Sequence, residues 1–401
     1  MVFGDNTSIV ALLLAWVIII ASAKALRLEK RGFEIKPFML TYKNHGVSST
    51  LDRLLAINRS AVRAFADVSI VAGAIMMVFA VWFLLNNLIH FFADSGKFSE
   101  VTLLIPGVTI RSVPNLVYFL LAAPIVLVVH EVAHGIVARL ERIKVKSGGF
   151  AIIIALIAGF VEPDEDEFNR ARRVSKVRVI AAGSTSNILL SFLVASLLIF
   201  NPAFGNVLEL LSPQVRSIFY NDPIGVPVVQ VIEGSGAAQA GMRAGDIITA
   251  INDTEVKTPA DLARVKLVPG EQVSVSILRD GEPMRLTVTV MGAEDDPSRG
   301  MIGIIRDVFP YMPPKVPFWI PWPHEVFMFL LWLWMLSFFI GIFNMLPMLP
   351  LDGEKYVSSM LENRVSAGSL KATRIGINAL GFGLLGANII ATVIKSGFIT
   401  I

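Results

Sequence analysis

The chain contains no cysteine, and both histidine and charged residues are scarce. Of 401 residues, five are His and only 17% are Asp, Glu, Lys or Arg, whereas soluble globular proteins average about 25% charged residues. The lack of cysteine excludes disulfides, thiolate metal sites and a cysteine nucleophile. The net charge is only +3, and this small basic excess argues against nucleic acid as a partner.

Long apolar stretches, in contrast, are abundant. The residues AVILMFWYC make up 54% of the chain, and several runs approach the length of about 20 residues that crosses a bilayer as a helix. These runs are Thr7–Ala23, Val68–Phe92, Leu116–Val137, Val179–Phe200, Val326–Leu346 and Ile375–Ile394. We therefore expect a polytopic α-helical membrane protein with about six transmembrane helices.

The basic residues predict which loops face the cytoplasm. Segments 24–63 and 139–178 hold nine Lys and Arg each, whereas segment 93–112 holds two. Basic loops stay on the cytoplasmic side of a membrane. Loops 24–67 and 139–178 are therefore expected inside, and segment 201–324 outside.

Two segments lack a helical pattern. Segment 144–168 has apolar runs that are interrupted by three glycines, and it is too short to cross the membrane twice as helix. It fits a β-hairpin or re-entrant element, whose backbone would need cover at membrane depth; an amphipathic surface loop is the alternative. Segment 222–291 is polar, with alternating strands separated by turn residues, and predicts a small α+β module.

The third apolar run carries a pattern typical of a metal site. It reads His130-Glu131-Val132-Ala133-His134, and on a helix both imidazoles would share one face with Glu131 beside them. Ionisable groups within such an apolar run are costly and are by default functional or paired. Zinc accepts imidazole and carboxylate ligands, and a catalytic zinc site keeps three protein ligands and a water molecule. Glu131 could take the proton from that water.

A third ligand could come from the end of the fifth apolar run. Pro347 and Pro350 must end or kink this helix, which would leave Asp352 on an irregular turn at the cytoplasmic end of its span. The topology brings Asp352 to a depth similar to that of the two histidines. A simple interfacial turn at Asp352-Gly353 is the alternative.

Together these motifs resemble the site-2 protease family of intramembrane zinc metalloproteases. That family pairs H-E-x-x-H in one span with N-x-x-P-x-x-x-x-D-G in a later one, and this chain has both patterns. The second is carried by Asn344, Pro347, Asp352 and Gly353. The resemblance implies His130, His134 and Asp352 as ligands of Zn²⁺, and Glu131 as the catalytic base.

The family also has an A-G-P-x-x-N element, which here runs from Ala182 to Asn187 with Ser184 in place of proline. The resemblance implies that Asn187 and Asn344 hold the substrate backbone or stabilise an oxyanion. A hydrogen bond between helices is the alternative for each asparagine. The resemblance further favours a membrane hairpin over 144–168, whose free edge could bind an unwound substrate strand.

Segment 234–252 resembles a PDZ domain of the bacterial protease type, although Gly236 and Met242 depart from its usual Pro and Leu. Such a domain binds peptides or ectodomain segments by strand addition. A steric plug that excludes folded ectodomains is the alternative.

These observations predict four regions and one main function. The regions are 1–67, an N-terminal span and basic loop; 68–205, the membrane core with the H-E-x-x-H span; 206–300, an extracytoplasmic PDZ domain; and 301–401, the remaining core. We expect an intramembrane endopeptidase that cuts transmembrane substrates already shortened by another protease. It would lie in the lipid bilayer of a prokaryotic plasma membrane with its active site towards the cytoplasm. An intramembrane metal transporter using the same His/Asp site, or an inactive scaffold, are the alternatives.

Overall fold

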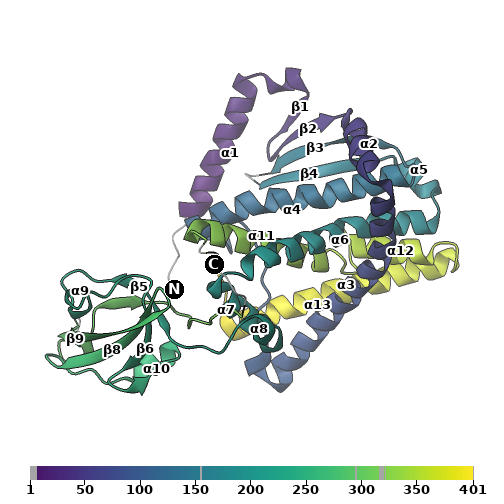
Figure 1. The fold of residues 1–401 in the computed structure, drawn as a ribbon. Helices are drawn as coiled ribbons and strands as arrows, with labels where there is room; N and C mark the ends of the chain where they lie inside the picture. Colours follow the sequence, from purple (N-terminus) through teal and green to yellow (C-terminus); the bar gives the residue numbers. More distant parts are fainter. Residues whose placement is uncertain (1–6, 154–155, 294–295, 316–319, 321, 401) are drawn as a thin grey trace. The chain divides into compact units, whose positions relative to one another are not determined.

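The computed structural model describes residues 7–153, 156–293, 296–315, 320 and 322–400 (Figure 1). The chain forms two compact units, Met1–Val194 with His324–Ile401, and Ala195–Pro323. The first unit contains the H-E-x-x-H pattern. The second contains the polar segment that predicts a small α+β module, and it is inserted between two parts of the first.

Five helices in the described part of the chain are long and apolar enough to cross a membrane. They are α3 (Arg59–Ala93), α4 (Val113–Leu140), α6 (Arg173–Leu198), α11 (His324–Phe343) and α13 (Ala367–Ser396). The multi-pass prediction is confirmed for these five. The first predicted span forms helix α1 (Thr7–Ala25), but its apolar stretch Leu12–Ala25 is shorter than the other five helices.

The shorter helices of this unit mark turns of the chain. They are α2 (Val47–Ile57), α5 (Glu165–Arg170), α12 (Asp352–Leu361) and the 3₁₀ turns η1 (Leu28–Arg31) and η2 (Ser95–Lys97). The prediction that Asp352 lies on an irregular turn is wrong, because Asp352 is the first residue of α12. Proline interrupts the chain before this point, and a carboxylate is favourable in the first turn of a helix, so the helix restarts there.

A four-stranded antiparallel sheet belongs to the same unit, with the order β1-β2-β3-β4. Its strands are β1 (Phe33–Lys36), β2 (Met39–Asn44), β3 (Val145–Ile153) and β4 (Leu156–Pro163). Strands β3 and β4 form the hairpin predicted for 144–168, so the surface-loop alternative is wrong. Residues 154–155, between these strands, lie outside the described residues.

Strands β1 and β2 fall in a segment for which only a basic loop is predicted. An aromatic ladder joins them to β3: Phe33, Tyr42 and Phe150 occupy paired positions of three neighbouring strands. The ring centroids of Phe33 and Tyr42 are 4.9 Å apart, and those of Tyr42 and Phe150 are 5.6 Å apart. Each such cross-strand pair contributes about 0.2–1 kcal/mol. Aromatic pairing therefore extends the hairpin into a sheet despite the surrounding charge.

Strand β4 is the edge of this sheet and lies alongside α4 (Figure 1). Gly159 allows the close approach, because a Cβ atom at this position would lie 2.9 Å from Val128 Cγ2 on α4. The glycine that interrupts the apolar run thus has a packing role. It places the edge of a β-sheet next to the helix that carries His130 and His134.

The second unit is built around a six-stranded sheet with the order β12-β5-β6-β8-β9, in which β7 also pairs with β6. Its strands are β5 (Val226–Val231), β6 (Ile247–Ile251), β7 (Thr254–Glu255), β8 (Gln272–Arg279), β9 (Glu282–Thr289) and β12 (Ile304–Arg306). The other elements are α7 (Pro202–Leu211), α8 (Pro213–Phe219), α9 (Gly236–Gln239), α10 (Pro259–Arg264), β10 (Met291–Gly292) and β11 (Gly300–Met301). The predicted α+β module is confirmed.

The insert has its own hydrophobic core and a regular hairpin. Ile248 and Ile251 of β6 are fully buried, together with Val226, Val275 and other aliphatic residues of neighbouring strands. Strands β8 and β9 are joined through Asp280-Gly281, both with positive φ, as a two-residue hairpin turn of type I′ requires.

A buried ion pair holds the start of β6 against the end of β8. The Arg279 guanidinium donates from Nε and Nη2 to the two carboxylate oxygens of Asp246, each at 2.7 Å. The Arg243 N–H donates to the same carboxylate at 2.8 Å. Burial alone would raise the pKa of Asp246, but these hydrogen bonds outweigh burial and hold its pKa below the usual value.

We expect Asp246→Asn to lower the free energy of unfolding of the insert by about 1.5–3 kcal/mol, the contribution of a hydrogen bond to a charged group. A carboxylate whose pKa is depressed by folding stabilises the fold above its unfolded pKa, so the wild-type insert should also lose stability as the pH falls below 3.8. Hydrogen exchange of β6 and β8 in the full-length chain measures both effects. The control is Arg264→Gln, which removes the exposed ion pair between Arg264 Nη1 and Asp261 Oδ1 at 3.7 Å. This substitution should change the free energy of unfolding little.

Candidate metal centre

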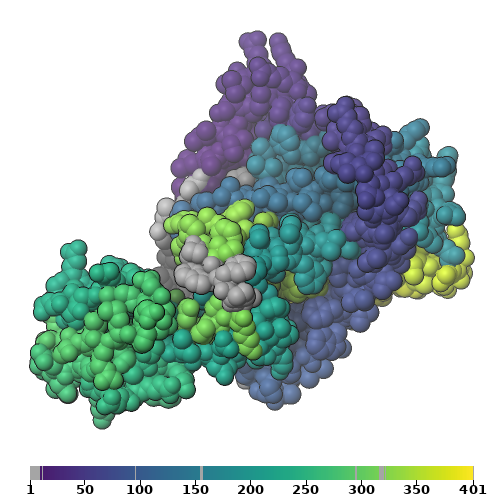
Figure 2. All heavy atoms as spheres, in the orientation of Figure 1, coloured from purple at the N-terminus to yellow at the C-terminus, as the bar shows by residue number. Residues whose placement is uncertain are grey.

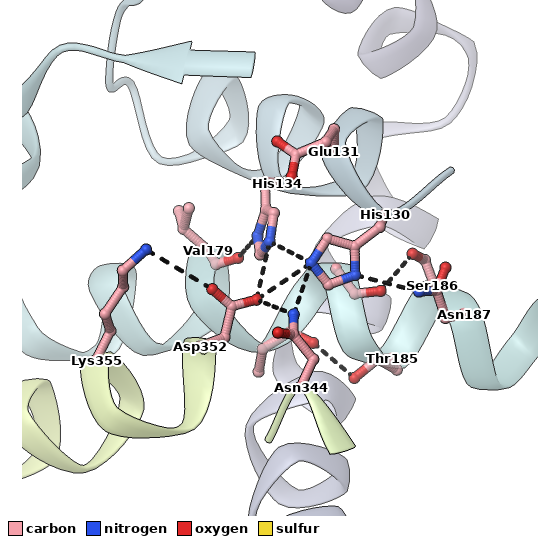
Figure 3. Close-up of polar contacts among 12 residues, drawn as sticks. His130, Glu131, His134, Val179, Thr185, Ser186, Asn187, Asn344, Asp352 and Lys355 are labelled. Atoms are coloured by element: carbon pink, nitrogen blue, oxygen red, sulfur yellow. Dashed lines mark hydrogen bonds and ion pairs between the residues drawn. The ribbon is translucent and has the colours of Figure 1, made fainter. Parts of the chain in front are cut away.

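Three ligand atoms from two helices meet between α4 and α12 (Figure 3). His130 Nε2 and His134 Nε2 lie 3.0 Å apart. Each also lies 3.2 Å from Asp352 Oδ2. His130 and Asp352 are buried, with 5% and 8% of their surface exposed. The structure therefore brings together the two histidines of the H-E-x-x-H pattern and the aspartate of the second motif.

These distances suit one metal ion. Zinc lies about 2.0–2.2 Å from histidine nitrogen and carboxylate oxygen in tetrahedral sites, which separates neighbouring ligand atoms by about 3.3 Å. The separations of 3.0–3.2 Å observed here are close to that value. Three protein ligands leave one position open, as in catalytic sites. His130, His134 and Asp352 could hold a divalent metal ion.

Helix α6 leaves room for the two imidazoles because it carries a glycine at the point of contact. A Cβ atom at Gly183 would lie 2.5 Å from His134 Nε2 and 2.6 Å from His130 Nε2. Real Cβ atoms essentially never make contacts this short, so a larger residue would displace both rings. Gly183 thus shapes the side of the site that faces α6.

The same helix fixes the orientation of His134. His134 Nδ1 lies 2.6 Å from the Val179 carbonyl oxygen of α6, so Nδ1–H donates and Nε2 keeps its lone pair for a metal. Metal-ligating histidines usually donate their second ring nitrogen in this way. On the other ring, Asn187 Nδ2 lies 3.2 Å from His130 Nδ1.

Asn344 lies beside the ligand atoms. Its Nδ2 is 3.0 Å from His130 Nε2 and 2.9 Å from Asp352 Oδ2 (Figure 3). The loop between α11 and α12 folds back on itself, since the Gly353 N–H donates to the Asn344 carbonyl oxygen at 3.0 Å. A Cβ atom at Gly353 would lie 2.2 Å from the Met345 carbonyl oxygen. The spacing of the second motif thus places its asparagine and aspartate side by side.

Comparison with known proteins gives the family. The model of peptidase family M50 matches residues 118–386, a range that includes the H-E-x-x-H pattern, the insert and the second motif. The chain belongs to peptidase family M50. This family comprises the site-2 proteases, so the sequence resemblance is confirmed.

Individual relatives match parts of this M50 chain. An uncharacterized protein of Methanocaldococcus jannaschii is 25% identical over 249 residues, covering 62% of this chain and 57% of the relative. The periplasmic pH-dependent serine endoprotease DegQ of Escherichia coli is 41% identical over 68 residues, covering 16% of this chain and 15% of DegQ. The chain thus spans less than two thirds of either relative.

Among solved structures, the PDZ domain of an SdrC-like protein from Listeria monocytogenes is 21% identical, with a TM-score of 0.19, and covers 21% of this chain and 87% of that domain. The described strands and helices of the insert agree with the predicted PDZ domain. This M50 protein is a polytopic helical membrane protein with a small α+β insert.

Glu131 lies next to the ligand cluster of the M50 site and outside it. Its Oε2 accepts a hydrogen bond of 3.1 Å from the Val161 N–H of β4. In Figure 3 no dashed line joins Glu131 to the three candidate ligands. The Glu131 carboxylate is therefore not one of the three candidate ligands, and it contacts the edge strand β4.

Several residues of the site could not be predicted from their side-chain type. Val179 acts through its backbone carbonyl, and Val161 through its backbone N–H, so their side chains reveal nothing. Gly183 lies within the A-G-P-x-x-N-like element, but only the packed structure shows which atoms it admits. The family pattern marks the position of this glycine without giving its reason.

We expect Gly183→Ala to reduce metal affinity by at least about 10-fold, because the added Cβ displaces both histidine rings from their ligand positions. The affinity is measured by competition between the purified full-length protein and a chromogenic zinc chelator. Gly386→Ala on α13 is the matched control, since a Cβ there has no atom within 4 Å. Unchanged zinc affinity in Gly183→Ala would show that the two histidine rings do not pack tightly against α6 at this position.

Proposed function

We propose that this M50 protein is a zinc-dependent intramembrane endopeptidase that hydrolyses peptide bonds in transmembrane segments of membrane-anchored proteins. The observation that carries the proposal is the cluster of His130, His134 and Asp352 within a unit of apolar helices, with Glu131 beside it. Ionisable groups at membrane depth are costly and mark functional sites. A site on such helices favours substrates that themselves lie in the bilayer.

The chain supplies the groups that peptide hydrolysis needs. Zinc bound here would polarise the scissile carbonyl and lower the pKa of a water molecule. Glu131 would take a proton from the attacking water and deliver it to the leaving amine. The Asn344 amide, on the ligand side of His130, would donate a hydrogen bond to the oxygen that becomes negative. One such donor contributes about 2.7–4 kcal/mol.

Strand β4 would hold the substrate in a form that can be cut. A transmembrane helix hides its carbonyl groups in its own hydrogen bonds, so it must unwind before water can attack. The edge of β4 beside α4 offers backbone groups for strand addition, and the Val161 N–H faces Glu131 there. This arrangement supports a substrate strand that lies between the sheet edge and the base.

The loop charges support an orientation for this site. If segments 24–67 and 139–178 are cytoplasmic, the H-E-x-x-H end of α4 lies towards the cytoplasm and the PDZ insert lies outside. The insert would then bind a peptide by strand addition or exclude a folded ectodomain by size. Both roles favour a substrate already shortened by another protease, in a prokaryotic plasma membrane.

We expect Glu131→Gln to lower kcat/KM about 100- to 10,000-fold while metal content stays at the wild-type level, because this residue serves as the base and is not a ligand. Cleavage of a tagged single-span substrate in proteoliposomes and metal analysis of the same preparation test the two parts. Glu165→Gln on α5 replaces an exposed carboxylate and is the matched control, with wild-type cleavage expected.

Equal cleavage by the wild type and Glu131→Gln would contradict the proposal. A transporter would instead give Asp352-dependent zinc uptake into the proteoliposomes without any cleavage. The same preparation therefore separates the two functions.

A further inference from the structure

Asn187 of α6 is fully buried behind His130 and has one unused polar atom. Its Nδ2 lies 3.2 Å from His130 Nδ1, while its Oδ1 has no hydrogen-bond partner among the residues the structure describes. The side chain has no exposed surface. A buried polar atom without a partner costs about 1–3 kcal/mol whichever way the amide is turned, so the contact with His130 decides its orientation.

The chemistry of the neighbouring imidazole points to the opposite orientation. His130 Nε2 faces Asp352, His134 and Asn344, so it is the nitrogen available to a metal. A ligating nitrogen uses its lone pair, and a neutral imidazole then carries its proton on the other nitrogen, Nδ1. That N–H needs an acceptor, which an amide nitrogen cannot be.

A half-turn of the Asn187 amide supplies this acceptor. The oxygen and nitrogen of an amide have nearly the same size, so the rotation exchanges them without moving other atoms. Oδ1 then lies where it can accept from His130 Nδ1–H, while Nδ2 takes the position that has no partner. We propose that Asn187 is a positioning residue that holds His130 in its metal-binding tautomer through its amide oxygen.

The arrangement around His134 supports this assignment. There the acceptor is the Val179 carbonyl oxygen, 2.6 Å from Nδ1. Val179, Gly183 and Asn187 follow one another at intervals of four residues, and residues at this spacing share one face of a helix. This face of α6 therefore provides an acceptor for each imidazole at its two ends and room for both rings in the middle.

The position of Asn187 separates its role from that of Asn344. Asn344 contacts His130 Nε2 and Asp352 Oδ2 on the ligand side, whereas Asn187 contacts the other nitrogen of the same ring (Figure 3). A group behind the ring is poorly placed to touch a substrate at the ligand face. The structure thus assigns metal positioning to Asn187 in place of the oxyanion role implied by the family resemblance.

Two substitutions distinguish the roles. Asn187→Asp keeps an oxygen acceptor, whereas Asn187→Leu keeps a similar size and removes the acceptor. A positioning role predicts that Asn187→Leu weakens zinc binding about 10- to 100-fold and that Asn187→Asp binds zinc at least as tightly as the wild type. An oxyanion role needs an N–H donor, so both variants would lose about 100- to 1,000-fold in kcat with unchanged zinc affinity.

The experiment measures zinc affinity by chelator competition in the full-length protein without substrate, and records the absorption spectrum of the cobalt-substituted protein. We expect a wild-type cobalt spectrum for Asn187→Asp and an altered one for Asn187→Leu. The control is Thr185→Val, since the Thr185 hydroxyl donates to Ala181 of its own helix. Its zinc affinity should equal that of the wild type.

The proposal rests on the zinc site of the proposed function, but its first readout, zinc affinity without substrate, does not depend on peptide cleavage. Wild-type zinc affinity in Asn187→Leu would overturn it. So would a loss of kcat in Asn187→Asp with normal zinc binding. If Asn187→Leu does not fold, the kcat and cobalt spectrum of Asn187→Asp still decide between the two roles.

Discussion

The structure depends on the burial of a carboxylate and two imidazoles among apolar helices. An unpaired charge in such surroundings costs several kcal/mol. His130, His134 and Asp352 meet at 3.0–3.2 Å, a spacing at which one cation can satisfy all three. The neighbouring features meet this requirement. Gly183 leaves room for both rings, and the Val179 carbonyl and the Asn187 amide contact their second nitrogens. The turn after α11 brings Asp352 close to both histidines.

A second constraint acts on the backbone. Non-helical backbone at membrane depth must be covered by protein or face a water-filled cavity. If the β3–β4 hairpin lies at that depth, its place in a four-stranded sheet and its packing against α4 would provide this cover. As the edge strand of its sheet, β4 has no partner strand on one side, and the Val161 N–H donates to Glu131 Oε2 instead. The catalytic base of the proposed mechanism and the proposed substrate-binding edge therefore share a hydrogen bond, so a strand added at β4 would contact the base directly.

Much of this architecture could be predicted from residue patterns. The apolar runs give the five membrane-length helices, and the two spaced motifs give the three candidate ligands. Strands β1 and β2 could not be predicted, because they are short, lie in a basic segment and depend on a partner more than a hundred residues away. The position of Asp352 in a helix could not be predicted either. Two prolines precede it, and only the folded chain shows that helix α12 begins at this residue.

The limits of motif reading are clearest for the two asparagines. Both occur in family motifs, and the spacing of each motif places an amide near the metal site, but spacing does not tell which nitrogen of an imidazole an amide will meet. That depends on the rotation of the His130 ring, which packs against α6 at Gly183. A rigid helix is well suited to this task, because ligands must keep their geometry to within about 0.5 Å. With α6 behind the rings, Asn344 of the turn after α11 and Asp352 at the start of α12 can form the substrate side of the site without also having to orient the histidines.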